Sequence, residues 1–227
     1  RFIDPVNVSS AGGLSEHPSV ATGGGGKVYI AWDDDKNLDK SIFFRRSDDY
    51  GSTYQPAANV SNTGSATVPA LGVTNNGTVL VAWQDVSTGP SEIRYARSLD
   101  GGANFLSSVQ VSSPNVPGDT STQASGVSLA VDSRTVGTGA GNVYLAWSEI
   151  NIQNATFTLR IARSTDNGAN WKFFALPDAP AGWGFVHSLA EDAAGVLYAG
   201  GTRLWKSVDD GNTWKVVPGM PDTYWGG

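Results

Sequence analysis

The stretch Ser207–Trp214 reads Ser-Val-Asp-Asp-Gly-Asn-Thr-Trp, and three earlier stretches follow the same pattern. They are Ser47–Tyr54, Ser98–Phe105 and Ser164–Trp171, so all four have the form Ser-x-Asp-x-Gly-x-(Thr/Asn)-aromatic. Their first serines lie between 43 and 66 positions apart. A motif that returns at intervals of this size is typical of repeat architectures. The sequence therefore predicts one structural unit that occurs four times.

Each shared position of the motif has a physical reason. Short Ser and Asp side chains can bond to nearby backbone amides, which closes a turn without a neighbouring strand. The glycine provides a backbone conformation that a β-carbon opposes. The closing aromatic side chain is expected to pack on an adjoining layer, where its burial contributes about 2–3 kcal/mol. The motif residues are Ser47, Asp49, Gly51 and Tyr54; Ser98, Asp100, Gly102 and Phe105; Ser164, Asp166, Gly168 and Trp171; and Ser207, Asp209, Gly211 and Trp214.

The motif resembles the Asp-box, also called the bacterial neuraminidase repeat. This repeat occurs in sialidases, sortilin-type receptor domains, xyloglucanases and photosystem assembly factors. The resemblance covers nearly the whole chain, and it is specific for architecture rather than for activity. It implies an all-β fold, a β-propeller of four-stranded antiparallel blades in which the motif forms the turn between the third and fourth strands.

The sequence around each motif repeats as well. Apolar runs of five or six residues, rich in Val, Ile and Tyr, suit strands that are buried on both faces between neighbouring blades. No stretch has the length and 3.6-residue period of an amphipathic helix. The expected strands are 18–22, 27–32, 41–46 and 58–61; 68–73, 78–83, 92–97 and 109–112; 127–131, 142–147, 158–163 and 172–176; and 187–191, 196–200, 203–206 and 215–217.

Residues 1–227 are expected to form a single propeller segment with four complete blades. The blades span about 14–61, 66–112, 124–177 and 184–218. Residues 1–9 resemble the outer strand that follows the first motif, and 219–227 resemble the lead-in to another blade. Either the four blades close on themselves or the chain is an arc of a larger ring. Because Asp-box families mostly have six or more blades, we expect the arc, whose open edges need a cover of further blades or other copies.

Composition limits the partners. The chain has no cysteine, and its formal net charge of −6 argues against nucleic acid as a ligand. No run of 18 apolar residues is present, so no membrane span is expected. Four Asn-x-Ser/Thr sequons favour an extracellular or cell-surface setting and are candidate glycosylation sites. They begin at Asn7, Asn59, Asn76 and Asn154.

In sialidases the face opposite the motif turns holds the active site. Three arginines at equivalent third-strand positions could converge there on an anion, as the arginines of sialidases grip a substrate carboxylate. They could equally be solvated strand residues or inter-blade ion pairs, and the Arg-Ile-Pro signature of sialidases is absent. A tryptophan in a blade connection could stack on a sugar. The candidate residues of this face are His17, Asp85, Arg94, Glu149, Arg160, Trp183 and Arg203.

Carboxylates follow the second strand of three successive repeats. Asp33, Asp85 and Glu149 are expected at similar positions, which is compatible with a two-carboxylate glycosidase or with ordinary strand ends in solvent. The first of them also opens Asp33-x-Asp35-x-Asn37-x-Asp39, whose alternating oxygen ligands resemble the first half of a calcium loop. Leu38 stands where such a loop needs glycine, so an ordinary acidic loop is the alternative.

The sequence thus predicts a secreted or cell-surface propeller that acts as a non-catalytic binding or assembly module. Its ligand would be a glycan or an extracellular protein, and no cofactor is expected apart from the candidate calcium ion. One alternative is a sialidase-like glycoside hydrolase of the exo-sialidase type, with part of its active site outside this segment. Another is a structural subunit of an extracellular oligomer or filament.

Overall fold

The computed structural model describes residues 5–9, 12–36, 39–87, 89–112, 121–134, 141–177 and 186–219. Within them lie sixteen strands, which form four antiparallel four-stranded sheets. The helical structure among these residues is one short 3-10 turn, Gly24–Gly26. The all-β fold predicted from the repeats is therefore confirmed. No helix of the described residues is long and apolar enough to cross a membrane.

Each sheet uses its strands in chain order, from an inner strand to a short outer one. The first sheet contains β1 (Ser15–Thr22), β2 (Val28–Asp34), β3 (Ser41–Ser47) and β4 (Ala58–Asn59). The second contains β5 (Ala66–Val73), β6 (Val79–Asp85), β7 (Glu92–Ser98) and β8 (Val109–Gln110). The third contains β9 (Thr122–Val131), β10 (Val143–Asn151), β11 (Thr156–Ser164) and β12 (Lys172–Ala175). The fourth contains β13 (Val186–Glu191), β14 (Leu197–Gly201), β15 (Leu204–Ser207) and β16 (Lys215–Val216).

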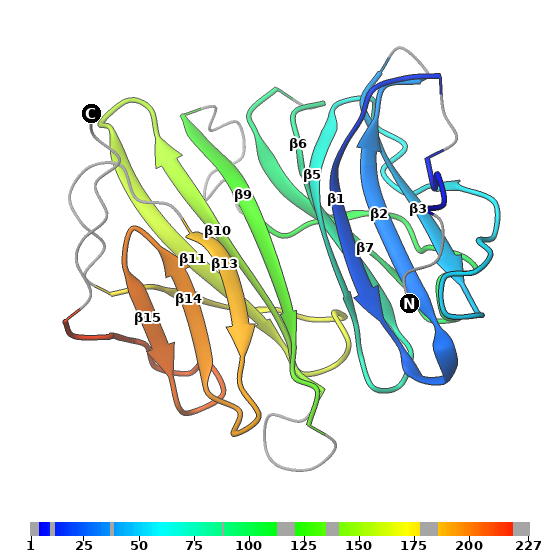
Figure 1. Ribbon diagram of the computed structural model, residues 1–227. Coiled ribbons are helices and arrows are strands. Elements are labelled where there is room, and N and C mark those ends of the chain that lie inside the picture. The colour runs from blue at the N-terminus through cyan, green and yellow to red at the C-terminus, as the bar shows by residue number, and fades with distance from the viewer. Residues whose placement is uncertain are drawn as a thin grey trace.

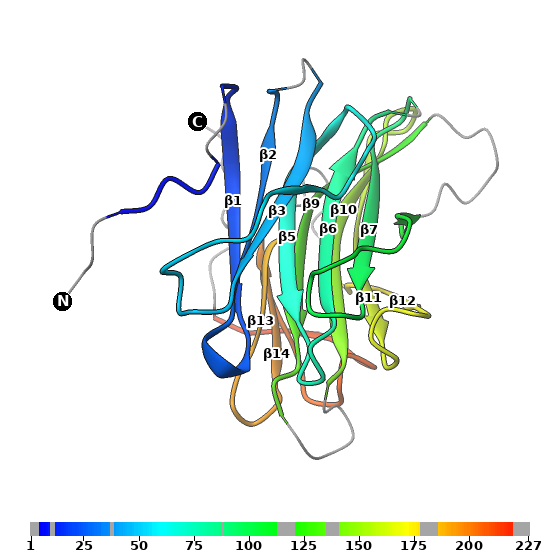
Figure 2. The same ribbon diagram turned by 90° about the vertical axis from the view of Figure 1, so that its right-hand side faces the viewer.

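The sheets stand beside one another like blades. Inner strands contact each other in the order β1, β5, β9, β13. Figure 1 shows the first sheet, in blue, and the fourth, in orange, at opposite ends of the row. Figure 2 shows β7 and β11 on the side away from β1, so the inner strands line one side of the fan. This is the radial arrangement of β-propeller blades.

The hydrophobic core lies between neighbouring sheets. Trp83 and Val81 pack toward the first sheet, whereas Ala82, between them in sequence, packs toward the third. Trp147 joins the cluster between the second and third sheets, and Trp205 joins the cluster between the third and fourth. Because successive residues of a strand point to opposite faces, a strand between two sheets needs apolar residues on both faces. This explains the uninterrupted apolar runs.

The motif turns are closed by their own side chains. In the first, Ser47 Oγ donates to Asp49 Oδ1 at 2.7 Å and accepts from Gly51 N at 2.9 Å. The Asp49 carboxylate also accepts from the Thr53 amide at 2.8 Å and from the Thr53 hydroxyl at 2.6 Å. The same serine–aspartate and serine–glycine bonds recur in the other three motifs. These bonds account for the fixed positions of the sequence pattern.

The motif turns also hold neighbouring blades together. The Phe105 ring meets the Phe44 ring of the preceding blade edge-on at 4.9 Å, and Trp171 meets Tyr95 in the same way at 5.3 Å. A basic residue stands before each motif serine, and three of these reach the next motif. Each donates to a backbone carbonyl oxygen of the following turn: Arg46 to Gly101, Arg97 to Asn167 and Arg163 to Asp210.

The lowered pKa values of the motif aspartates predict that the fold loses stability in acid. Hydrogen bonds from Thr53 and Ser47 lower the pKa of Asp49 to about 2, and bonds from Ser98 and Asn104 lower the pKa of Asp100. A carboxyl group whose pKa falls on folding stabilises the fold above its unfolded pKa, here 3.8, and loses that contribution as pH falls through the folded value. We therefore expect the melting temperature to fall between about pH 4 and pH 2.

Thermal unfolding followed by circular dichroism across this pH range checks the expectation. Asp49→Asn should lower the melting temperature at neutral pH and reduce its fall in acid, because the amide no longer titrates. Asp48→Asn is the matched control, since Asp48 is exposed and its neighbour Asp49 closes the turn. Identical pH profiles for Asp49→Asn and the parent chain would contradict this role of the motif.

The amino-terminal segment differs from the expectation. Residues 5–9, the described part of the predicted outer strand 1–9, are not in a strand. An outer strand needs the third strand of its own blade as a partner, and each of the four sheets already has its own fourth strand. The predicted lead-in, 219–227, lies outside the described residues except for Gly219.

Candidate functional site

A bulge in the first inner strand places His17. In the β1–β2 ladder Glu16 pairs with Asp33 and Ser19 with Ala31, so two residues of β1 face one residue of β2. His17 has a φ of 48°, in the left-handed region that side chains other than glycine rarely adopt. Bulges of this kind redirect a side chain, and strained residues cluster at functional sites. The same irregularity recurs in the inner strands of the other three sheets, so the bulge is a feature of the repeat, and in the first blade the residue that it redirects is His17.

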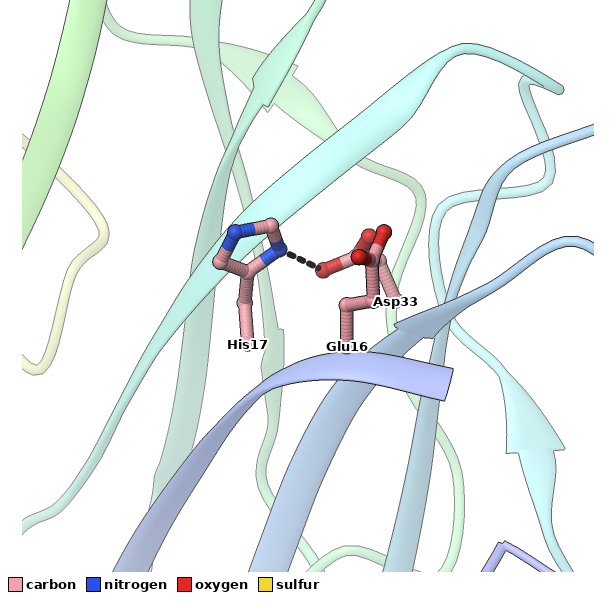
Figure 3. Close-up of side chains that lie close together, drawn as sticks. All are labelled: Glu16, His17 and Asp33. Atoms are coloured by element: carbon pink, nitrogen blue, oxygen red, sulfur yellow. Dashed lines mark hydrogen bonds and ion pairs between the residues drawn. The ribbon is translucent and has the colours of Figure 1, made fainter. Parts of the chain in front are cut away.

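Four polar side chains meet at this bulge. His17 Nδ1 lies 2.8 Å from Asp33 Oδ1. Lys40 Nζ, just before β3, lies 2.5 Å from Glu16 Oε2 and 3.3 Å from Asp33 Oδ2. Figure 3 shows the His17 ring turned toward the carboxylates of Glu16 and Asp33. We call these four residues, Glu16, His17, Asp33 and Lys40, the His17 cluster.

The His17 cluster combines a buried anion with an accessible imidazole. The Asp33 side chain is fully buried (0% exposed), whereas that of His17 is 49% exposed. Because an ionised carboxylate only accepts hydrogen bonds, the bond to Asp33 requires His17 Nδ1 to donate. In the neutral ring Nε2 is then free to accept a proton or a hydrogen bond. The hydrogen bond to Glu16, with Asp33 as a second partner, raises the pKa of Lys40.

The cluster lies at the end of the sheet opposite the first motif turn. In the β2–β3 ladder Val28 pairs with Ser47, where the motif begins, and Asp34 pairs with Ser41 at the other end. Glu16 and Asp33 belong to this second end. The cluster therefore lies at the inner strand of the first blade, on the face where the sequence placed candidate ligand residues.

A recurring contact accounts for the carboxylates that follow the second strands. The indole Nε1 of each second-strand tryptophan donates to the carboxylate two residues later. The distances are 3.2 Å for Trp32–Asp34, 3.0 Å for Trp83–Asp85 and 3.0 Å for Trp147–Glu149. The expectation that Asp33 is the counterpart of Asp85 and Glu149 is therefore wrong, since residues two apart in a strand share a face and residues one apart do not. Asp34 is the counterpart, and Asp33 points to His17.

Two of the three candidate arginines pair with a carboxylate of their own sheet. Arg94 Nη1 lies 2.7 Å from Glu92 Oε1, and Arg160 Nε lies 2.8 Å from Glu149 Oε2. Both lie on third strands, β7 and β11, whereas the His17 cluster is built on β1 and β2. The Arg203 carbonyl accepts from Gly201 N at the corresponding position of the fourth sheet. Trp183 lies outside the described residues.

The residues of the predicted calcium loop point to different neighbours. Asp35 Oδ1 accepts from Leu14 N at 2.7 Å, Asp33 belongs to the His17 cluster, and Asp39 lies against Gly64. Asn37 lies outside the described residues. Among the residues that the structure describes, one group of histidine and carboxylate side chains brings its ligand atoms within 4.8 Å of one another. It consists of Glu16, His17 and Asp33.

The four sequons differ in accessibility. Asn76 and Asn154 are exposed in tight turns, and Asn7 is exposed near the amino terminus. Asn59, in contrast, is half-buried. Geometry therefore favours Asn76 and Asn154 over Asn59 as acceptors of a glycan, and glycosylation itself stays a prediction.

No protein-family model and no curated protein sequence matches the chain. Solved structures do match. A leech intramolecular trans-sialidase, in complex with 2,7-anhydro-Neu5Ac, superposes with a TM-score of 0.68 over 96% of this chain and 53% of its own, at 13% identity. The chain is similar in fold to the sialidase β-propellers. The Hadza microbial sialidase Hz136 gives 0.63 over 90% of this chain and 46% of its own, at 19% identity. An α-L-arabinanase of Penicillium chrysogenum, complexed with arabinobiose, gives 0.60 over 89% and 60%, at 16% identity.

The similarity to the sialidases is one of fold. The chain spans about half the length of the two sialidase-type structures. The sequence indicated His17 and Asp33 for separate roles, and it did not predict their contact with each other or with Lys40. The pairing of β1 with β2 across the glycine turn could have brought these residues together. Counting residue pairs back from that turn gives the wrong partners, because the bulge adds a residue between Glu16 and Ser19.

Proposed function

We propose that this chain is a glycan-binding β-propeller module whose ligand is held at the His17 cluster. The observation that carries the proposal is the half-exposed imidazole of His17, oriented by the buried carboxylate of Asp33. Support also comes from the comparisons, because the similar structures include sialidases and an arabinanase, proteins that act on carbohydrates. The proposed setting is extracellular or on the cell surface, and no catalytic step is assigned to this segment.

The chemistry of the cluster suits the hydroxyl groups of a sugar. His17 Nε2 accepts a hydrogen bond from a hydroxyl, and Lys40 donates one while its partner Glu16 accepts another. Two carboxylates surround one lysine, so the cluster is not a receptor for an anion. Arg94 and Arg160 already pair with carboxylates of their own sheets. We therefore propose a neutral sugar rather than sialic acid as the ligand.

Binding to an array of neutral and acidic glycans tests this function. We expect binding to neutral glycans, and His17→Ala should weaken it about tenfold or more, because a hydrogen bond to a desolvated partner contributes roughly 1–3 kcal/mol. Tyr50→Ala is the control, since Tyr50 is 82% exposed on the opposite, motif end. Binding confined to sialylated glycans, or equal binding by His17→Ala and the parent chain, would refute the proposal.

A second candidate is a sialidase-like glycoside hydrolase with part of its active site outside these residues. The observation that favours it is the likeness in fold to structures about twice as long. Turnover of a fluorogenic sialoside by the chain, lost in Arg94→Ala and Arg160→Ala, would favour this candidate. Turnover that these substitutions leave unchanged would show that neither arginine takes part in the reaction.

A further inference from the structure

We propose that Glu16, His17 and Asp33 bind a divalent transition-metal ion such as Zn²⁺, and that the ammonium group of Lys40 takes the place of the ion in the metal-free chain. This inference does not rest on glycan binding. It rests on the kinds of ligand atom that the first two strands bring together, and on the position of Lys40 among them.

The three side chains provide a suitable set of ligand atoms. One imidazole nitrogen and two carboxylate oxygens lie within 4.8 Å of one another. Zn²⁺ binds such atoms at about 2.0–2.2 Å in tetrahedral geometry, which places them about 3–4 Å apart. Shifts of about 1 Å or less would therefore bring the three atoms onto one ion, and a fourth position would stay open to water or a ligand. When His17 Nδ1 binds the ion, it gives up its hydrogen bond to Asp33 and the neutral ring carries its proton on Nε2.

The backbone holds two of these ligands firmly. Glu16 and Asp33 are direct partners in the β1–β2 ladder, so their Cα atoms are fixed relative to each other. Asp33 Oδ1 also accepts from Val68 N of the second blade at 3.4 Å, and its side chain is fully buried. His17 adjoins Glu16 within the bulge. Only the half-exposed side chains need to adjust on binding, which lowers the entropic cost.

Lys40 marks the position of the cation. Its Nζ lies 2.5 Å from Glu16 and 3.3 Å from Asp33, the two carboxylates that an ion would share. Its side chain is one-third exposed, so it can turn toward solvent when an ion enters. An ammonium group and a divalent cation repel each other at such distances. Metal binding and the two Lys40 ion pairs therefore exclude each other, and Lys40 weakens the affinity for metal.

The ligand set favours a transition metal over calcium. Calcium takes six to eight oxygen ligands, whereas imidazole nitrogen suits zinc, copper, iron and nickel. The cluster offers three protein ligands, one of them nitrogen. This replaces the calcium loop of Asp33, Asp35, Asn37 and Asp39 with a different set of residues and a different class of ion.

Calorimetric titration with Zn²⁺, together with the absorption spectrum of bound Co²⁺, tests the proposal on the full chain. We expect one ion per chain, with affinity about tenfold or more lower in His17→Ala and in Glu16→Gln. Lys40→Met should do the opposite and raise affinity about tenfold, because it removes the competing charge. Thermal melting of each variant confirms that it is folded.

The chain offers a clean background, since it has two histidines and no cysteine. His187→Ala is the control for binding by the other histidine and should leave the affinity unchanged. Loss of binding in His187→Ala, unchanged binding in His17→Ala, or no gain in Lys40→Met would each overturn the proposal. Calcium binding as tight as zinc binding would overturn the assignment of the metal class.

Discussion

Gly102→Ala should lower the free energy of unfolding by about 2–5 kcal/mol. Gly102 belongs to the second motif and has a φ of +85°, where a β-carbon costs roughly 1–2 kcal/mol. That β-carbon would also lie 2.7 Å from the Phe44 ring of the preceding blade. Phe44 is buried and packs against both Tyr29 and Phe105, so it must shift to admit the β-carbon, and overpacking costs a further 1–3 kcal/mol or so.

Urea unfolding of Gly102→Ala and Gly77→Ala separates the two contributions. Gly77 has nearly the same φ, +84°, but a β-carbon added there would meet no other atom within 4 Å. Gly77→Ala should therefore cost only the backbone term, about 1–2 kcal/mol. Equal losses in the two variants would mean that the neighbouring blade does not pack on the motif glycine.

Asp85→Ala should cost about 2–4 kcal/mol, because it removes the acceptor of the buried Trp83 indole N–H and of two further donors. The Asp85 carboxylate accepts from Trp83 Nε1 at 3.0 Å, from Thr63 Oγ1 at 2.6 Å and from Ser87 N at 2.9 Å. Burial alone would raise the pKa of Asp85, but these bonds outweigh it and lower the pKa. The carboxylate is thus charged and structural, rather than a free acid of a catalytic pair.

Two further variants separate lost hydrogen bonds from lost packing. Asp48→Ala, at an exposed motif position, should change stability by about 0.5 kcal/mol or less. In Trp83→Phe the indole N–H is already absent, so adding Asp85→Ala should cost less than it does in the parent chain. Strictly additive losses would contradict a direct bond between Trp83 and Asp85.

The fold could be predicted from the repeats because the recurring motif and the apolar runs indicated the same four-stranded unit. The apolar runs ending at Trp32, Trp83 and Trp147 lie in second strands, and the motif serines end third strands, as expected. Three inner strands begin two or more residues earlier than predicted, at Ser15, Ala66 and Thr122, because pairing resumes beyond a bulge. Period-two patterning does not reveal such a break, so bulged strand ends are missed.

The site was less predictable than the fold. His17 and Asp33 are distant in sequence, and their contact depends on the bulge and on the tilt of one side chain. Arg46 is a second example of a contact that the sequence did not predict. The sequence shows a basic residue before each motif serine, but it does not show that Arg46 donates to the Gly101 carbonyl of the next blade. Contacts between blades depend on how the sheets fan, which no single repeat encodes.

Long-range ¹H–¹⁵N NMR spectra of the imidazole groups test the account of the site most directly, because the chain has only two histidines. His17→Gln assigns the His17 signals. We predict that neutral His17 carries its proton on Nδ1, because that atom donates to Asp33, and that Asp33→Asn changes this tautomer balance. A neutral His17 that carries its proton on Nε2, with a spectrum unaffected by Asp33→Asn, would contradict the hydrogen bond from His17 to Asp33 on which the proposed glycan site is built.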